Sequence, residues 1–174
     1  MRRAFLSSLL ASMLWFEACA VPAWVNTVEQ DAQIAAPIAA SLIDVIDPSL
    51  APVVTLIENA FNALVKTLDT YKASPTATNL QAVQSAFAAV NGNVAQLESA
   101  AQIKNTGTAG TLAQVVALLS QAVAEIAARM PASMSATLGV KATGGARAKG
   151  WKARDFKREF NKIAKSDPRL KPLK

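Results

Sequence analysis

The feature that most constrains this chain is a set of apolar stripes, in which apolar residues recur at alternating spacings of three and four. Because an α-helix has about 3.6 residues per turn, this spacing puts the side chains on one face of a helix. The same spacing is typical of helices that pack side by side. Three segments carry such a stripe clearly. Its members are Leu50, Val53, Ile57, Phe61, Leu64, Leu68 and Tyr71; then Leu80, Val83, Phe87, Val90, Val94, Leu97 and Ala101; then Leu112, Val115 or Val116, Leu119, Val123, Ile126 and Met130.

A fourth helical segment, residues 24–47, precedes these three and has a less regular stripe. Its apolar residues on one face are Val28, Ile34, Ile38, Leu42 and Val45. Pro37 lies within the segment, where it removes one backbone hydrogen-bond donor. We therefore predict that this helix kinks or breaks near Pro37.

Several residues mark the expected ends of these helices. Pro48 ends the first helix, because the residue before a proline is pushed out of the helical region. Ser74 is the expected N-cap of the third helix, and Thr111 with Gln114 forms a capping box for the fourth. Gly92 costs about 1 kcal/mol relative to alanine inside a helix. It therefore predicts a split in the third helix.

Short connections between these segments favour antiparallel neighbours. We predict an all-α fold, an up-down-up-down four-helix bundle formed by residues 21–137, with helix crossings near 20°. Strand patterns are essentially absent. Of the 174 residues, 36 are alanine, which favours helix and lets helices approach closely but contributes little buried area. The expected core is therefore small, with Phe61, Phe87 and Tyr71 as its few large members.

The first 20 residues have the organisation of a secretory signal peptide. Arg2 and Arg3 precede an apolar run over residues 4–16, and small residues flank Cys19. The apolar run is shorter than the roughly 20 residues that a transmembrane helix needs. We therefore predict a signal peptide over residues 1–20 and a protein exported to the periplasm or anchored at the cell envelope.

Two short motifs in this leader resemble bacterial export signals. Residues 2–6 resemble the twin-arginine signal, whose core is two arginines, any residue, then Phe-Leu. Residues 16–19 resemble a lipoprotein box, in which the cysteine becomes the lipidated first residue of the mature protein. The second resemblance implies that Cys19 is lipidated and that acyl chains hold the protein at a membrane. The alternative is that Cys19 is one more small residue of a cleaved signal peptide.

Composition excludes the commonest kinds of enzyme site. The chain contains no histidine and one cysteine, so it cannot form a Cys/His zinc site, an intrachain disulfide or a histidine general base. Neither a Ser-x-x-Lys motif in the predicted bundle nor a Gly-x-Ser-x-Gly elbow occurs. We expect a non-catalytic protein that uses no cofactor or metal. We place the carboxylates of the bundle on solvated helix faces; they are Glu29, Asp31, Asp44, Asp47, Glu58, Asp69, Glu98 and Glu125.

Charge is distributed unevenly along the chain. Residues 24–140 contain four basic and eight acidic residues, whereas residues 141–174 contain twelve basic and three acidic residues. Residues 138–150 are rich in glycine, alanine and basic residues, which is typical of a flexible linker. Residues 151–174 form a basic tail, and such a tail is suited to an anionic partner.

The tail contains a short amphipathic helix that ends before Pro168. Its apolar stripe is Trp151, Phe156, Phe160 and Ile163, and its other faces carry Lys152, Arg154, Lys157, Arg158, Lys162 and Lys165. Asp155 with Arg158 and Glu159 with Lys162 are expected to form ion pairs along the helix. The candidate residues for binding an anionic surface or partner are Trp151, Lys152, Arg154, Phe156, Lys157, Arg158, Phe160 and Lys162.

The sequence leaves several interpretations of this helix open. It lies on an anionic membrane with its aromatic face among the headgroups, or it docks on the bundle and leaves its charges in solvent. Nucleic-acid binding is less favoured, because no recognition motif accompanies the charges. We predict a non-catalytic binding or structural role at the bacterial cell envelope, with an anionic membrane surface or an envelope protein as partner. The alternatives are a carrier of small apolar ligands in a cavity lined by Phe61, Phe87 and Leu119, and a bundle that opens onto lipid.

Overall fold

The computed structural model describes residues 21–44, 48–103, 109–132, 134 and 150–174. Within these residues the protein is all-helical and contains no β-strand, which confirms the predicted all-α class. The α-helices are α1 (Ala23–Ala40), α2 (Ala51–Ala73), α3 (Ala77–Ile103), α4 (Ala109–Arg129) and α6 (Ala153–Ser166). Two short 3₁₀-helices, Ser41–Asp44 and Pro48–Leu50, lie between α1 and α2. The predicted signal peptide, including Cys19, and nearly all of the predicted linker lie outside the described residues.

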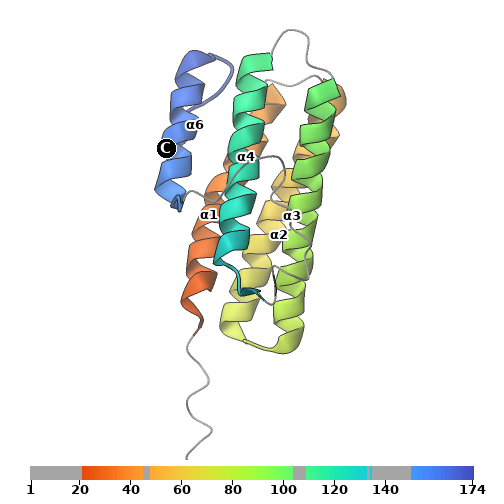
Figure 1. The fold of residues 1–174 in the computed structure, drawn as a ribbon, viewed down its shortest axis with the longest axis vertical. Coiled ribbons are helices and arrows are strands. Elements are labelled where there is room, and N and C mark those ends of the chain that lie inside the picture. The colour runs from red at the N-terminus through yellow and green to blue at the C-terminus, as the bar shows by residue number, and fades with distance from the viewer. Residues whose placement is uncertain (1–20, 45–47, 104–108, 133, 135–149) are drawn as a thin grey trace, which may run out of the picture.

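The helices lie side by side along the long axis of the molecule, and successive helices run in alternating directions (Figure 1). Helix α2 packs against α1 and α3, and α4 packs against the same two neighbours. The basic C-terminal helix α6 packs against α4 and α1. The described fold therefore has five packed α-helices, because the tail helix docks on the others.

The core follows the predicted stripes closely. Phe61 in α2, Phe87 in α3 and Leu119 in α4 are fully buried, together with most other members of their stripes. In α2, Val54 is fully buried whereas the predicted Val53 is only half-buried. Because α2 packs against both α1 and α3, its buried face is wider than the single apolar stripe predicted from the sequence.

Two predicted breaks in the helices do not occur, whereas the alternative of a kink at Pro37 stays a prediction. Helix α1 continues through Pro37 to Ala40, because Ala36 and Ile38 on either side of the proline are buried in the core and hold the helix there. Helix α3 continues through Gly92, which is exposed while Val90 and Val94 beside it are buried. In both helices the packing of the neighbouring residues outweighs a local cost of about 1 to 3 kcal/mol.

The predicted helix caps are also wrong in detail. Thr76 caps α3 in place of Ser74, since its side-chain oxygen accepts a hydrogen bond of 3.2 Å from the backbone N–H of Asn79. Helix α4 begins at Ala109, so Thr111 lies inside the helix and is not its N-cap. The Thr111 hydroxyl is used instead in a contact with the C-terminal segment.

Helix α4 is the most apolar helix of the described chain. Residues Gly110–Arg129 are long and apolar enough, by length and composition, to span a membrane, with a mean hydropathy of 1.5. In the structure 61% of this apolar stretch is buried. Helix α4 has α1, α3 and α6 as neighbours, and a helix with neighbours on most sides is expected to be apolar all round. The packing thus accounts for the hydropathy of α4 as that of a core helix.

Candidate functional site

The aromatic members of the predicted binding site face the interior. Phe156 and Phe160 are fully buried, and Ile163 and Ala164 complete the face that α6 presents to α1 and α4. Trp151 is half-buried and packs edge-on against Phe156, with 5.4 Å between the ring centroids. The docked helix therefore uses its apolar face for packing, which is the arrangement that places its charges in solvent.

The basic members of the predicted site face outward. Lys152, Arg154, Arg158 and Lys162 are exposed, and Lys157 is half-buried with its ammonium group donating to the backbone carbonyl of Lys174. Both predicted ion pairs form: Arg158 contacts Asp155 at 3.0 Å and Lys162 contacts Glu159 at 2.9 Å. Such exposed pairs are worth a few tenths of a kcal/mol. They leave the outer surface of α6 with a net positive charge.

The C-terminal end of α6 is tied to the start of α4. The carboxylate of Asp167 is buried, accepts hydrogen bonds of 2.9 and 2.6 Å from the side chain of Arg169, and also accepts one from the Thr111 hydroxyl. The hydrogen bonds from Arg169 hold the pKa of Asp167 well below its ordinary value, and that of Arg169 is raised in turn. Leu170 is buried next to this contact, so the last turn of α6 is fixed by both polar and apolar groups.

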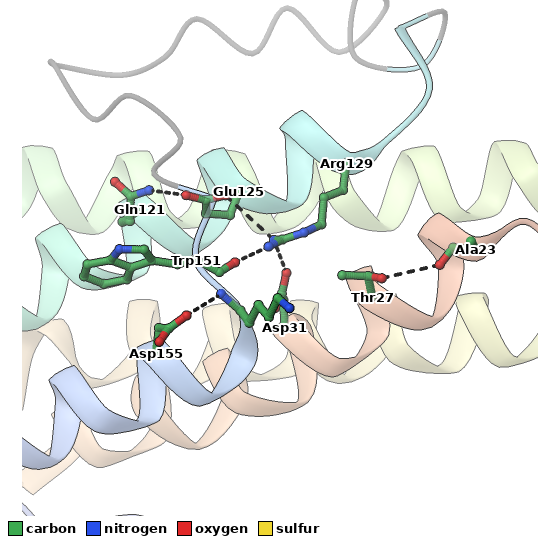
Figure 2. Close-up of polar contacts among 9 residues, drawn as sticks. Ala23, Thr27, Asp31, Gln121, Glu125, Arg129, Trp151 and Asp155 are labelled. Carbon is green, nitrogen blue, oxygen red and sulfur yellow. Dashed lines mark hydrogen bonds and ion pairs between the residues drawn. The ribbon is translucent and has the colours of Figure 1, made fainter.

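The N-terminal end of α6 meets a buried charge cluster, which we define as Asp31, Gln121, Glu125 and Arg129. The guanidinium of Arg129, at the end of α4, donates to Asp31 in the middle of α1 and to the backbone carbonyl of Trp151 (Figure 2). It also lies 3.9 Å from Glu125, which accepts a hydrogen bond of 2.8 Å from Gln121. One arginine thus connects α1, α4 and the residue that leads into α6.

Both carboxylates of the buried charge cluster are almost completely removed from solvent. Asp31 is 1% exposed and Glu125 is 2% exposed, whereas the Arg129 side chain is 18% exposed. Burial raises the pKa of Asp31 to about 6; Arg129 opposes this shift, Glu125 adds to it, and the backbone N–H of Ala153 opposes it weakly. In the described part of the chain these two buried carboxylates share one guanidinium, so the groups of the cluster sum to a negative charge when both are ionised.

The prediction that all carboxylates lie on solvated faces is wrong for Asp31 and Glu125. A signal was present in the sequence, because Asp31 follows Val28 by three residues and precedes Ile38 by seven, which puts it on the apolar face of α1. Glu125 likewise precedes Ile126 within the stripe of α4. An acid in such a position needs a buried cation as partner, and Arg129 is the only basic residue of α4.

The described residues offer little for bond-making chemistry. No group of three or more His, Cys, Asp or Glu side chains within them is placed to hold a metal ion. Phe61, Phe87 and Leu119, the predicted lining of a ligand cavity, are fully buried members of the common core. Searches of protein-family models, curated proteins and solved structures find no match to this chain. The site that the structure describes is therefore a docked basic helix held at both ends.

Proposed function

We propose that this protein is a non-catalytic helical-bundle protein of the bacterial cell envelope, which uses the outer face of α6 to contact an anionic surface. The observation that supports this proposal is the division of α6 into a buried apolar face and an exposed basic face. If α6 served only to complete the core, its function would depend on its buried residues alone. Its outer face could then carry positive and negative charges in equal number. The outer face of α6 instead carries an excess of cations.

The geometry of the basic face favours an extended anionic partner. Arg154, Arg158 and Lys165 recur at spacings of four and seven, so they lie along one side of the helix. From Arg154 to Lys165 the helix rises about 16 Å, at about 1.5 Å per residue. Because Phe156 and Phe160 are already buried, the contact is electrostatic and does not involve insertion of aromatic side chains. The alternative is that the basic face of α6 is a solvated surface that binds no partner.

We expect binding to vesicles that contain anionic phospholipid to depend on these exposed cations. Each cation near an anionic membrane is worth about 1 kcal/mol, so the double variant Arg154→Gln/Lys165→Gln should bind about 30-fold more weakly. Vesicle co-sedimentation at several salt concentrations measures this loss. Both residues are exposed, so the fold should be retained.

The matched control is Lys66→Gln, which neutralises an exposed cation on α2. It should leave vesicle binding unchanged. Equal binding of the wild-type protein to neutral vesicles, or no binding to anionic vesicles at low salt, would contradict the proposal. Binding to duplex DNA but not to vesicles would make nucleic acid the partner, and leakage of an enclosed dye would indicate a membrane-active bundle.

The location at the envelope is proposed from the leader alone. If the protein is a lipoprotein, its mature form from a bacterial host begins at Cys19 and carries acyl chains, and Cys19→Ser abolishes this processing. Intact mass spectrometry distinguishes this product from a chain cut near Val21 without lipid, which would make the protein a free exported bundle. An uncut chain would contradict export altogether.

A further inference from the structure

The buried charge cluster lies where α1, α4 and the start of α6 meet, and its arginine donates hydrogen bonds to α1 and to the segment that leads into α6 (Figure 2). We propose that uptake of a proton by Asp31 strengthens the docking of α6, so that α6 is held more tightly in mild acid than above neutrality. This goes beyond the proposed contact with an anionic surface and does not depend on it.

The charged and polar groups around Asp31 come from each element packed against it. Helix α4 supplies Arg129 and Glu125, and the segment that leads into α6 supplies the Trp151 carbonyl, through Arg129, and the N–H of Ala153. On α1 itself, Thr27 lies one turn earlier and donates to the Ala23 carbonyl at 3.4 Å. Arg129 is therefore the one cation in contact with Asp31 among the described residues.

The geometry leaves a place for a proton. Oδ2 of Asp31 accepts from Arg129, whereas Oδ1 is buried and has no hydrogen-bond partner among the described residues. A buried, unpaired carboxylate oxygen is unfavourable, and the nearby carboxylate of Glu125 adds repulsion. Protonation of Asp31 removes the excess charge and leaves Glu125 paired with Arg129.

Protonation of Asp31 is coupled to the docking of α6 because α6 helps to bury Asp31. Helix α6 packs against α1 as well as α4, and Ala153 in its first turn faces Asp31. When α6 leaves, Asp31 meets water and its pKa returns toward the ordinary value of about 3.9. The docked form, with the pKa of Asp31 near 6, then binds the proton more tightly. By linkage, docking gains strength as the pH falls from about 6 toward 4 and is weakest above pH 6.

Hydrogen exchange of the α6 backbone amides at pH 5 and pH 8, corrected for the intrinsic pH dependence of exchange, tests the proposal. A pKa difference of about two units corresponds to an effect of up to 100-fold. At pH 5, which lies about one pH unit below the pKa of Asp31 in the docked form, only part of this effect is reached: α6 protection should be about 10-fold higher than at pH 8. The chain contains no histidine, so few other groups titrate in this range.

The variant Asp31→Asn should show α6 protection that no longer changes between pH 5 and pH 8. The matched control Asp69→Asn, on an exposed carboxylate of α2, should keep the wild-type pH dependence. Equal pH dependence in the wild type and Asp31→Asn would overturn the proposal, as would a pH response shared equally by α2 and α3. If Asp31→Asn does not fold, the pKa of Asp31 can be measured in the wild-type protein by NMR titration of its carboxyl carbon. A midpoint near pH 4 while α6 remains docked would contradict the proposal.

Discussion

Replacing Arg129 with methionine should lower the free energy of unfolding by about 3 to 5 kcal/mol at pH 7.5. Methionine fills a similar volume, so the loss comes from charge and hydrogen bonding more than from packing. Without the guanidinium, the buried carboxylates of Asp31 and Glu125 lose the cation that lies between them, and the Trp151 carbonyl loses the hydrogen bond that Arg129 donates. Urea unfolding followed by circular dichroism measures the change.

The ion pair between Lys72 and Glu29 is the matched control. It joins α2 to α1 at 2.6 Å, as Arg129 joins α4 to α1, but its side chains are 27% and 14% exposed. The pKa of Lys72 is raised, chiefly by its hydrogen bond to Asp69 and next by that to Glu29, so the pair does interact. Ion pairs that solvent still reaches contribute about 0 to 1 kcal/mol, and both partners of this pair are more exposed than Asp31, so Lys72→Met should cost about 1 kcal/mol or less. Similar losses in the two variants would show that burial of the Arg129 cluster has no special energetic role.

A second substitution shows whether the stability lost in Arg129→Met is due to the carboxylates that have lost their ion-pair partner. Adding Asp31→Asn removes one of the two negative charges left behind, so the double variant should recover part of the lost stability. The destabilisation by Arg129→Met should also be smaller at pH 5, since a carboxylate without its cation takes up a proton more readily. Strict additivity of the two substitutions would contradict a direct interaction.

The helices could be predicted from the sequence, because their apolar spacing reflects the geometry of a helix packed on one side. The stripe of α3, from Val83 to Leu97, is buried as predicted. Predictions that rest on one residue fared worse: Pro37 and Gly92 lie inside continuous helices. Their local cost is fixed by residue type, whereas the packing that outweighs it depends on neighbours that the sequence does not place.

The position of α6 could not be predicted for a physical reason. Phe156 and Phe160 among cations have the same pattern whether the apolar face meets lipid or another helix. The signal that favours docking lies elsewhere in the chain, in α4. Gln121, Glu125 and Arg129 follow one another at spacings of four on a largely apolar helix, and such a polar row requires a partner when it is buried. That partner is the junction of α1 with the start of α6.

Truncation of the α6 aromatic residues should separate α6 from the rest of the fold. Phe160 is fully buried, and replacing a buried phenylalanine with alanine costs about 3 to 5 kcal/mol. Either Phe156→Ala or Phe160→Ala alone should therefore remove most of the protection of α6 amides in hydrogen exchange. The remaining helices keep their contacts with one another, because the main neighbours of α6 are α1 and α4, which also pack against each other and against α2 and α3.

The double variant Phe156→Ala/Phe160→Ala shows whether α6 can leave the other helices by itself or unfolds only together with them. Once the first substitution has released α6, the second removes a side chain that is already in solvent, so its added cost should be below 1 kcal/mol. The control Leu56→Ala, at a side chain that is 50% exposed, should cost less than either single variant. Full additivity of the two phenylalanine substitutions would mean that α6 unfolds only with the whole protein. Saturation would instead mean that α6 has its own docking equilibrium, which is the property that proton uptake at Asp31 requires in order to act on it.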